Sequence, residues 1–121
     1  MDTWHALIIE DDPDGQDVVS RIFTYNQISH DLADNAEDAL QLVENNHYTV
    51  AIVDLALPGI DGWGFLKAVQ ETVNIPCIAI TAYHSPEVAI KAIESGFKAY
   101  FSKPIDTTSF MREIERVMSD G

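Results

Sequence analysis

The chain has 121 residues, with 20 acidic against 7 basic side chains, a formal net charge of −13 and 46% hydrophobic residues. This is the size of one domain with a sizeable core, and its acidity argues against direct binding of nucleic acid or of an anionic membrane surface. No apolar run reaches the roughly 20 residues of a membrane-spanning helix, no signal peptide is evident and the lone Cys77 has no disulfide partner, so we expect a cytoplasmic protein.

Short runs rich in Ile and Val alternate with segments of helical period along the chain. A strand at 6–9 precedes a helix that begins at Pro13 with Asp12 as its N-cap. A weaker strand at about 29–33 precedes a helix at about 36–46. The buried strand 50–53 leads through a turn at 57–62 into a third helix, and the strand 77–80 leads into a helix capped by Ser85. The short strand 99–101 precedes a last helix that opens at Asp106 or Thr107.

Each predicted helix has one apolar face, whereas the strands are apolar on both faces. The residues expected to point inward are Val18, Val19, Ile22, Phe23 and Tyr25; Ala36, Ala39, Leu40 and Val43; Leu66, Val69 and Val73; Val88, Ala89, Ala92 and Ile93; and Phe110, Ile114 and Val117. Strands apolar on both faces, each followed by an amphipathic helix, indicate a parallel sheet covered on both sides. The pattern therefore predicts a doubly wound α/β domain.

Polar residues follow the predicted strands where each strand ends. Glu10 and Asp11 follow the first strand, Asp54 the third, Thr81 the fourth, and Lys103 comes shortly after the fifth. Because ligands of such sheets bind beyond the carboxyl ends of the strands, we expect these side chains to share one rim. Clustered carboxylates repel one another unless a cation joins them, and hard oxygen ligands suit Mg²⁺. With a hydroxyl and a lysine beside them, they are suited to accept a phosphoryl group.

Four motifs occur in order along the chain: Leu7-Ile8-Ile9-Glu10-Asp11-Asp12; Val53-Asp54 with Leu57-Pro58-Gly59-Ile60-Asp61-Gly62; Ile80-Thr81-Ala82; and Tyr100-Phe101-Ser102-Lys103-Pro104. With this order and spacing, the sequence resembles the receiver domain of two-component response regulators over essentially its whole length. The resemblance implies a flavodoxin-like (βα)5 fold, in which a five-stranded parallel sheet has the strand order 2-1-3-4-5. It also implies a single domain over residues 1–121.

The resemblance also implies roles for individual residues. Asp54 would be the phospho-acceptor. The metal ligands would be Glu10, Asp11, Asp54 and the backbone carbonyl of Ala56, holding Mg²⁺ or, as a possible substitute, Mn²⁺. Lys103 would pair with the phosphoryl group and Thr81 would hydrogen-bond to it. Tyr100 would be the aromatic residue whose exposure changes when Thr81 moves.

The function implied by the resemblance is a phosphorylation-controlled switch rather than a conventional enzyme. The domain would catalyse its own phosphorylation from a histidine kinase or a histidine phosphotransfer domain, and its own slow dephosphorylation. Phosphorylation would then alter the face formed by the fourth helix, the fifth strand and the fifth helix. That face would regulate a downstream protein or a fused output domain, and a phosphorylation-dependent homodimer is possible. The chain ends soon after the last predicted helix, which favours a receiver cut from a longer protein over a stand-alone regulator.

Several candidate residues also have a plainer interpretation, whereas Glu10, Asp11 and Asp54 do not. Asp12 is explained by capping a helix, Thr81 by strand propensity, Lys103 by an exposed loop and Tyr100 by packing alone. Cys77 is expected to be a small core residue. Trp63 is expected to pack near the site, and Asp61 and Gly62 to serve the turn and the helix start. The four histidines show no metal-ligand spacing, so a zinc site is not expected.

Particular residues argue against the functions of other proteins that have similar sheets. A haloacid-dehalogenase-type phosphatase would need an acid at Ala56, a flavodoxin would need a phosphate loop in place of residues 10–13, and no P-loop motif is present. A receiver-like interaction module that works without phosphorylation stays open as the alternative. Ala56 and Tyr83 lack a carboxylate or amide that would orient an attacking water, so we expect a slowly hydrolysing acyl phosphate.

Overall fold

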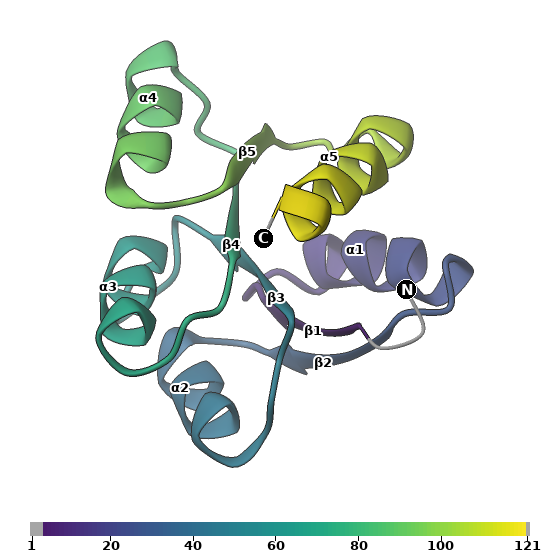
Figure 1. Ribbon diagram of the computed structural model, residues 1–121. Helices are drawn as coiled ribbons and strands as arrows, with labels where there is room; N and C mark the ends of the chain where they lie inside the picture. The colour runs from purple at the N-terminus through teal and green to yellow at the C-terminus, as the bar shows by residue number, and fades with distance from the viewer. Residues whose placement is uncertain (1–3, 121) are drawn as a thin grey trace.

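The computed structural model describes residues 4–120 as five strands that alternate with five helices (Figure 1). The strands are β1 (His5–Ile9), β2 (Ser29–Ala33), β3 (Val50–Asp54), β4 (Cys77–Thr81) and β5 (Ala99–Ser102). The helices are α1 (Pro13–Tyr25), α2 (Ala36–Asn45), α3 (Gly62–Thr72), α4 (Pro86–Ser95) and α5 (Thr107–Asp120). Over the described residues, no helix combines the length and hydropathy that a bilayer crossing requires.

The strands form one parallel sheet in the order β2-β1-β3-β4-β5, which confirms the predicted flavodoxin-like, doubly wound topology. The strand order switches at β1: β2 is added on one side of β1, and β3, β4 and β5 follow on the other side. The carboxyl ends of β1 and β3 therefore lie side by side at the point where such folds bind ligands.

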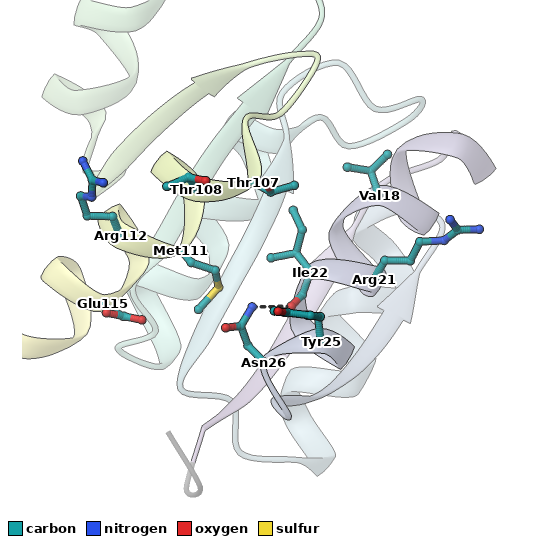
Figure 2. Close-up of a pocket in the computed structure, with 10 residues that line it drawn as sticks. All are labelled: Val18, Arg21, Ile22, Tyr25, Asn26, Thr107, Thr108, Met111, Arg112 and Glu115. Atoms are coloured by element: carbon teal, nitrogen blue, oxygen red, sulfur yellow. Dashed lines mark hydrogen bonds between the residues drawn. The ribbon is translucent and has the colours of Figure 1, made fainter.

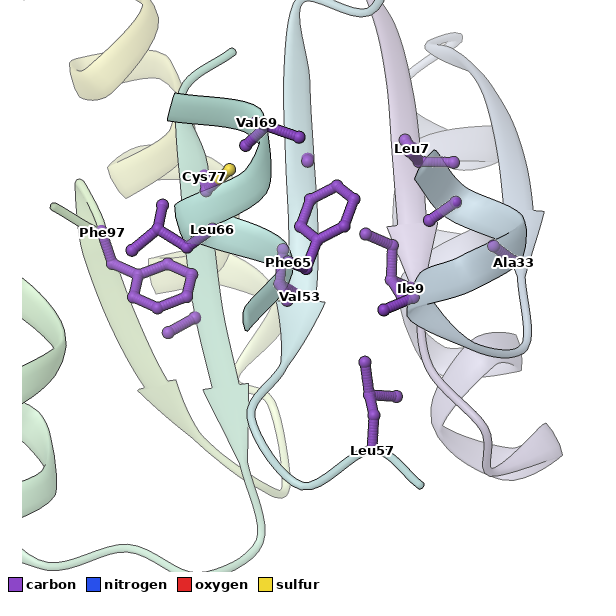
Figure 3. Packing of buried hydrophobic residues seen from close by; sticks show 14 of the residues in the cluster. Leu7, Ile9, Ala33, Val53, Leu57, Phe65, Leu66, Val69, Cys77 and Phe97 are labelled. Atoms are coloured by element: carbon purple, nitrogen blue, oxygen red, sulfur yellow. The ribbon is translucent and has the colours of Figure 1, made fainter. Parts of the chain in front are cut away.

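Helices α1 and α5 cover one face of the sheet, and α2, α3 and α4 cover the other (Figure 1). Alternate strand residues enter the two cores: Leu7 and Ile9 of β1 face the α2–α4 side, whereas Ala6 and Ile8 face α1 and α5. Figure 3 shows Phe65 of α3 packed toward the sheet in the first of these cores. Because both faces are covered, the central strands β3 and β4 are completely buried, and each is apolar up to its last residue, Asp54 or Thr81.

A polar side chain caps the start of every helix, and Asp106 does so for α5 by accepting from the backbone amide of Thr108 at 3.0 Å. Asp12, Asn35, Asp61 and Ser85 accept hydrogen bonds from backbone amides in the first turns of α1, α2, α3 and α4. Each cap satisfies one of the amides that the start of a helix leaves unpaired. The predicted capping roles of Asp12, Asp61 and Ser85 are confirmed.

Four residues predicted to point inward are instead exposed. On α1, Tyr25 is 87% and Val18 is 41% exposed, because Val19, Ile22 and Phe23 alone meet the sheet. Val73 lies beyond the end of α3, and Ile93 faces outward because α4 buries only Ala92. Periodicity identified the apolar side of each helix but overestimated its width.

Cys77 lies in the core at the start of β4, as predicted, with 1% of its surface exposed. Burial raises the pKa of its thiol to about 12, since the thiolate would be desolvated there. The neutral thiol packs as a small apolar group.

Candidate functional site

Three polar side chains are buried within the part of the chain that the structure describes, and all three lie at the carboxyl edge of the sheet. Glu10 follows β1, Asp54 ends β3 and Thr81 ends β4, and they are 0%, 4% and 2% exposed. The register pairs Ile9 with Val53, which places Glu10 beside Asp54. Buried carboxylates carry a large desolvation cost unless they are paired or bind a cation.

Lys103 supplies the positive charge at this edge. It follows β5, and its backbone amide donates to the carbonyl of Thr81 at 2.9 Å. Its ammonium donates to the carboxylate of Glu10 and, at 3.1 Å, to Oδ2 of Asp54. The other oxygen of Asp54 accepts from the backbone amide of Ala56 at 3.0 Å. Thus Asp54 is oriented by a backbone donor on one side and an ammonium on the other.

The pKa values of these groups move in opposite directions. Burial raises the pKa of Glu10 to about 7, helped by its hydrogen bond with Asp54 and opposed by Lys103. Burial also acts on Asp54, but its hydrogen bonds with Glu10 and Ala56 and the charge of Lys103 outweigh it and lower the pKa. The pKa of Lys103 is raised by both carboxylates against the effect of its own burial. Asp54 is therefore the carboxylate that stays ionised at neutral pH.

An acidic cluster formed by Glu10, Asp11 and Asp54 fits a divalent cation. Each residue offers a carboxylate oxygen, and these oxygens all lie within 4.8 Å of one another. When all three carboxylates are ionised, the ammonium of Lys103 balances only one of their negative charges, and a divalent cation would balance the other two. Oxygen donors of this kind and number suit Mg²⁺, which keeps part of its water shell. Asp12 is exposed and caps α1 and is not part of this cluster.

Thr81 and Tyr100 lie on neighbouring strands next to this cluster. The hydroxyl oxygen of Thr81 accepts from the backbone amide of Tyr83 at 3.0 Å. Tyr100 is half-buried, and its hydroxyl is hydrogen-bonded to Nδ1 of His84 at 2.9 Å. A hollow of about 170 Å³ beside Thr81 is lined by Leu55, Ala56, Trp63, Thr81, Tyr83 and Val88.

Trp63 packs near the site as expected. Its ring meets Phe97 edge to face at 5.8 Å, and the ammonium of Lys91 lies 4.9 Å from its centroid. These contacts fix the indole as one wall of the hollow beside Thr81.

Two residues that shape the site were not identified from the sequence. A Cβ on Gly15 would lie 2.1 Å from Oε1 of Glu10, so a glycine in the first turn of α1 leaves room for that carboxylate. Gln16 donates its side-chain amide to the backbone carbonyl of Glu10 and to Asp34, both at 2.6 Å. A glycine inside a helix lowers helix stability by about 1 kcal/mol relative to alanine. A glycine within the predicted first helix could therefore have indicated that Gly15 has a packing role.

A larger groove of about 780 Å³ runs between α1 and α5, away from the acidic cluster (Figure 2). Val18, Ile22 and Tyr25 line its α1 side, and Met111 and Arg112 lie on its α5 side. None of the candidate site residues lines this groove. This groove explains why Val18 and Tyr25 are exposed, since both side chains line the groove and do not pack against the sheet.

Comparison with known proteins assigns the family. The family model described as the response regulator receiver domain matches residues 6–115. An uncharacterized 14.6 kDa protein of Leptolyngbya boryana is 32% identical, over 91% of this chain and 86% of its own length. The heme response regulator HssR of Staphylococcus saprophyticus is 29% identical over 93% of this chain, which spans 50% of HssR. The transcriptional regulatory protein HprR of Escherichia coli is 28% identical, and the chain spans 48% of it.

Solved structures of receiver domains are also similar to this chain. The receiver domain of the Francisella response regulator 1452 is 27% identical, with a TM-score of 0.87 and 98% of each chain covered. A CheY-like receiver domain protein from Methanospirillum hungatei is 25% identical, with a TM-score of 0.86, covering 97% of this chain and 94% of that one. With its sheet order, its acidic edge and the family match over residues 6–115, the chain belongs to the receiver domains of two-component response regulators.

Proposed function

We propose that residues 1–121 form one receiver domain that accepts a phosphoryl group on Asp54. The donor is a phosphohistidine of a histidine kinase or of a histidine phosphotransfer domain. An Asp54 oxygen forms a bond to phosphorus while the bond from phosphorus to the histidine nitrogen breaks, and that nitrogen keeps the electron pair. The observation that carries this proposal is the position of Asp54, a buried carboxylate whose low pKa keeps it ionised beside Lys103.

The surrounding residues have distinct tasks in this reaction. Lys103, already held between Glu10 and Asp54, pairs with the oxygens of the transferred group, and Thr81 donates its hydroxyl to them. Glu10, Asp11 and Asp54 would hold Mg²⁺, or Mn²⁺ in its place, with their clustered carboxylates. The backbone carbonyl of Ala56 would be a further ligand. When bound, the cation neutralises charge that develops on the phosphoryl oxygens.

Phosphorylation acts as a switch through Thr81 and Tyr100, favouring another conformation of the face formed by α4, β5 and α5. This face regulates a downstream protein or a fused output domain in the cytoplasm, or pairs two phosphorylated copies. The chain spans about half of HssR and HprR, which is consistent with an output domain outside the receiver. The alternative is a module that binds its partner without phosphorylation.

Intact-mass measurement after incubation with acetyl phosphate tests the proposal. We expect one added phosphoryl group in the presence of Mg²⁺, none after removal of the metal, and none in Asp54→Asn. Asp61→Asn is the matched control, because Asp61 caps α3 from an exposed position and asparagine caps equally well. No adduct on the wild type, together with no binding of beryllofluoride as a control for rapid hydrolysis, would favour the phosphorylation-independent module.

Tyr83 is expected to set the lifetime of the acyl phosphate. It is 75% exposed and lines the hollow beside Thr81, but it carries no group that activates water. Tyr83→Glu should speed loss of the phosphoryl group by about tenfold, less than the roughly 10²–10⁴-fold of a fully positioned general base. The measurement is the decay of the phosphorylated mass with time, with Tyr25→Glu on distant α1 as the control. An unchanged or slower decay in Tyr83→Glu would contradict this role.

A further inference from the structure

The segment that leaves β4 is held at both of its ends by hydrogen bonds. At one end, the buried hydroxyl oxygen of Thr81 accepts from the backbone amide of Tyr83 at 3.0 Å. At the other end, the exposed His84 is hydrogen-bonded through Nδ1 to the hydroxyl of Tyr100 at 2.9 Å, and their ring centroids are 5.6 Å apart. Only two residues lie between Thr81 and His84, so the two attachments belong to one short loop.

The hydroxyl of Tyr100 also interacts with the residue that caps α4. Burial raises the pKa of Tyr100, and the backbone of Ser85 opposes this rise by interacting with the Tyr100 hydroxyl. Ser85 in turn caps α4 by accepting from the amide of Val88 at 3.1 Å. The hydroxyl of Tyr100 is thus tied to the loop at the point where α4 begins.

We propose that His84 is the positioning residue that transmits movement of Thr81 to Tyr100 and to the start of α4. This inference rests on the proposed function. When the hydroxyl of Thr81 turns toward a phosphoryl group on Asp54, its oxygen moves away from the amide of Tyr83 and releases the loop at that end. The hydroxyl of Tyr100 then either follows His84 or loses this hydrogen bond.

The hydrogen bonds of the loop, rather than the pairing of the strands, connect Thr81 with Tyr100 through His84. Tyr100 is half-buried against the core on the α2–α4 side, so part of its ring faces solvent. Thr81 pairs with Ser102 in the sheet register, two residues beyond Tyr100, so the sheet itself does not place the two side chains opposite each other. The loop through Tyr83 and His84 connects them by two hydrogen bonds.

The experiment uses protein labelled with 3-fluorotyrosine, with the ¹⁹F signal of Tyr100 assigned from Tyr100→Phe. Mg²⁺ with beryllofluoride, which mimics the acyl phosphate, is titrated into the wild type and into His84→Phe, His84→Ala and His84→Gln. His84→Phe keeps a ring but has no nitrogen, whereas His84→Gln keeps a hydrogen-bonding side chain. His47→Phe, an exposed histidine after α2, is the matched control.

In the wild type, the Tyr100 signal should shift as the site saturates. His84→Phe and His84→Ala should still bind beryllofluoride to saturation but lose most of that shift, whereas His84→Gln and His47→Phe should retain it. In a double-mutant cycle, Tyr100→Ala should change beryllofluoride affinity in the wild type and leave it unchanged in His84→Phe.

A full Tyr100 shift in both His84→Phe and His84→Ala would overturn the role of His84, and so would a wild-type signal that does not move at saturation. A wild type that binds no beryllofluoride would instead overturn the proposed function, and the inference with it.

Discussion

Replacing Gly62 with alanine should lower the free energy of unfolding by about 3 kcal/mol, the upper part of the usual range for overpacking. Gly62 begins α3 directly against the end of β3. An added Cβ would lie 2.4 Å from the carbonyl oxygen of Asp54 and 2.8 Å from Cα of Leu55. Both neighbours are backbone atoms, so relief requires moving the strand end that carries Asp54. Denaturant unfolding measures the loss, and acetyl phosphate labelling should be slower in the same variant.

Gly64→Ala is the control for this prediction, because it lies in the same turn of the same helix. Its Cβ would approach Cγ2 of Ile60 at 2.9 Å, which belongs to a side chain of a surface loop. That side chain can move, and alanine raises helix propensity by up to about 1 kcal/mol over glycine. We therefore expect nearly unchanged stability in Gly64→Ala. Equal losses in the two variants would show that the contact with Asp54 and Leu55 is not the cause.

The metal-free protein should lose about 3 kcal/mol of stability between about pH 4.5 and pH 7, because Glu10 is forced to ionise in a buried position. Burial raises the pKa of Glu10 from 4.5 to about 7, so the folded state binds more protons than the unfolded state between these values. Stability therefore falls as pH rises through this window. The lowered pKa of Asp54 has the opposite effect, but it acts only as pH falls below that residue's ordinary value of 3.8.

Two comparisons isolate the contribution of Glu10 in thermal or denaturant unfolding across this pH range. Glu10→Gln should flatten the pH dependence, since the buried charge is removed. Mg²⁺ should raise the melting temperature above pH 7 by binding the folded state, and more than Ca²⁺ or Na⁺ at matched ionic strength. A slope that persists in Glu10→Gln would assign the effect to other groups, and an equal effect of Na⁺ would assign the gain to screening.

Much of the fold followed from local patterns. The apolar runs 50–53 and 77–80 are continuous because both faces of the sheet are covered, so they were identified as buried parallel strands. Asp12 and Ser85 marked the starts of α1 and α4 because capping depends on only a few neighbouring residues. Helix faces were less well predicted, since the width of a buried face depends on what packs against it. Tyr25 illustrates this, because it borders the groove beside α5.

The sequence by itself determined which groups lie at the carboxyl edge, since strand ends are set by local pattern and parallel strands end at the same edge. Tertiary structure decided how these groups pair. The ammonium of Lys103 meets Glu10, 93 residues away, only because the strand order closes that distance. Burial then decided which carboxylate stays ionised, because Glu10 has only a distant backbone donor, the amide of Asp12 at 3.5 Å, whereas Ala56 donates to Asp54 at 3.0 Å. The contact of His84 with Tyr100 arises in the same way, from the packing of β4 beside β5, and no local pattern encodes it.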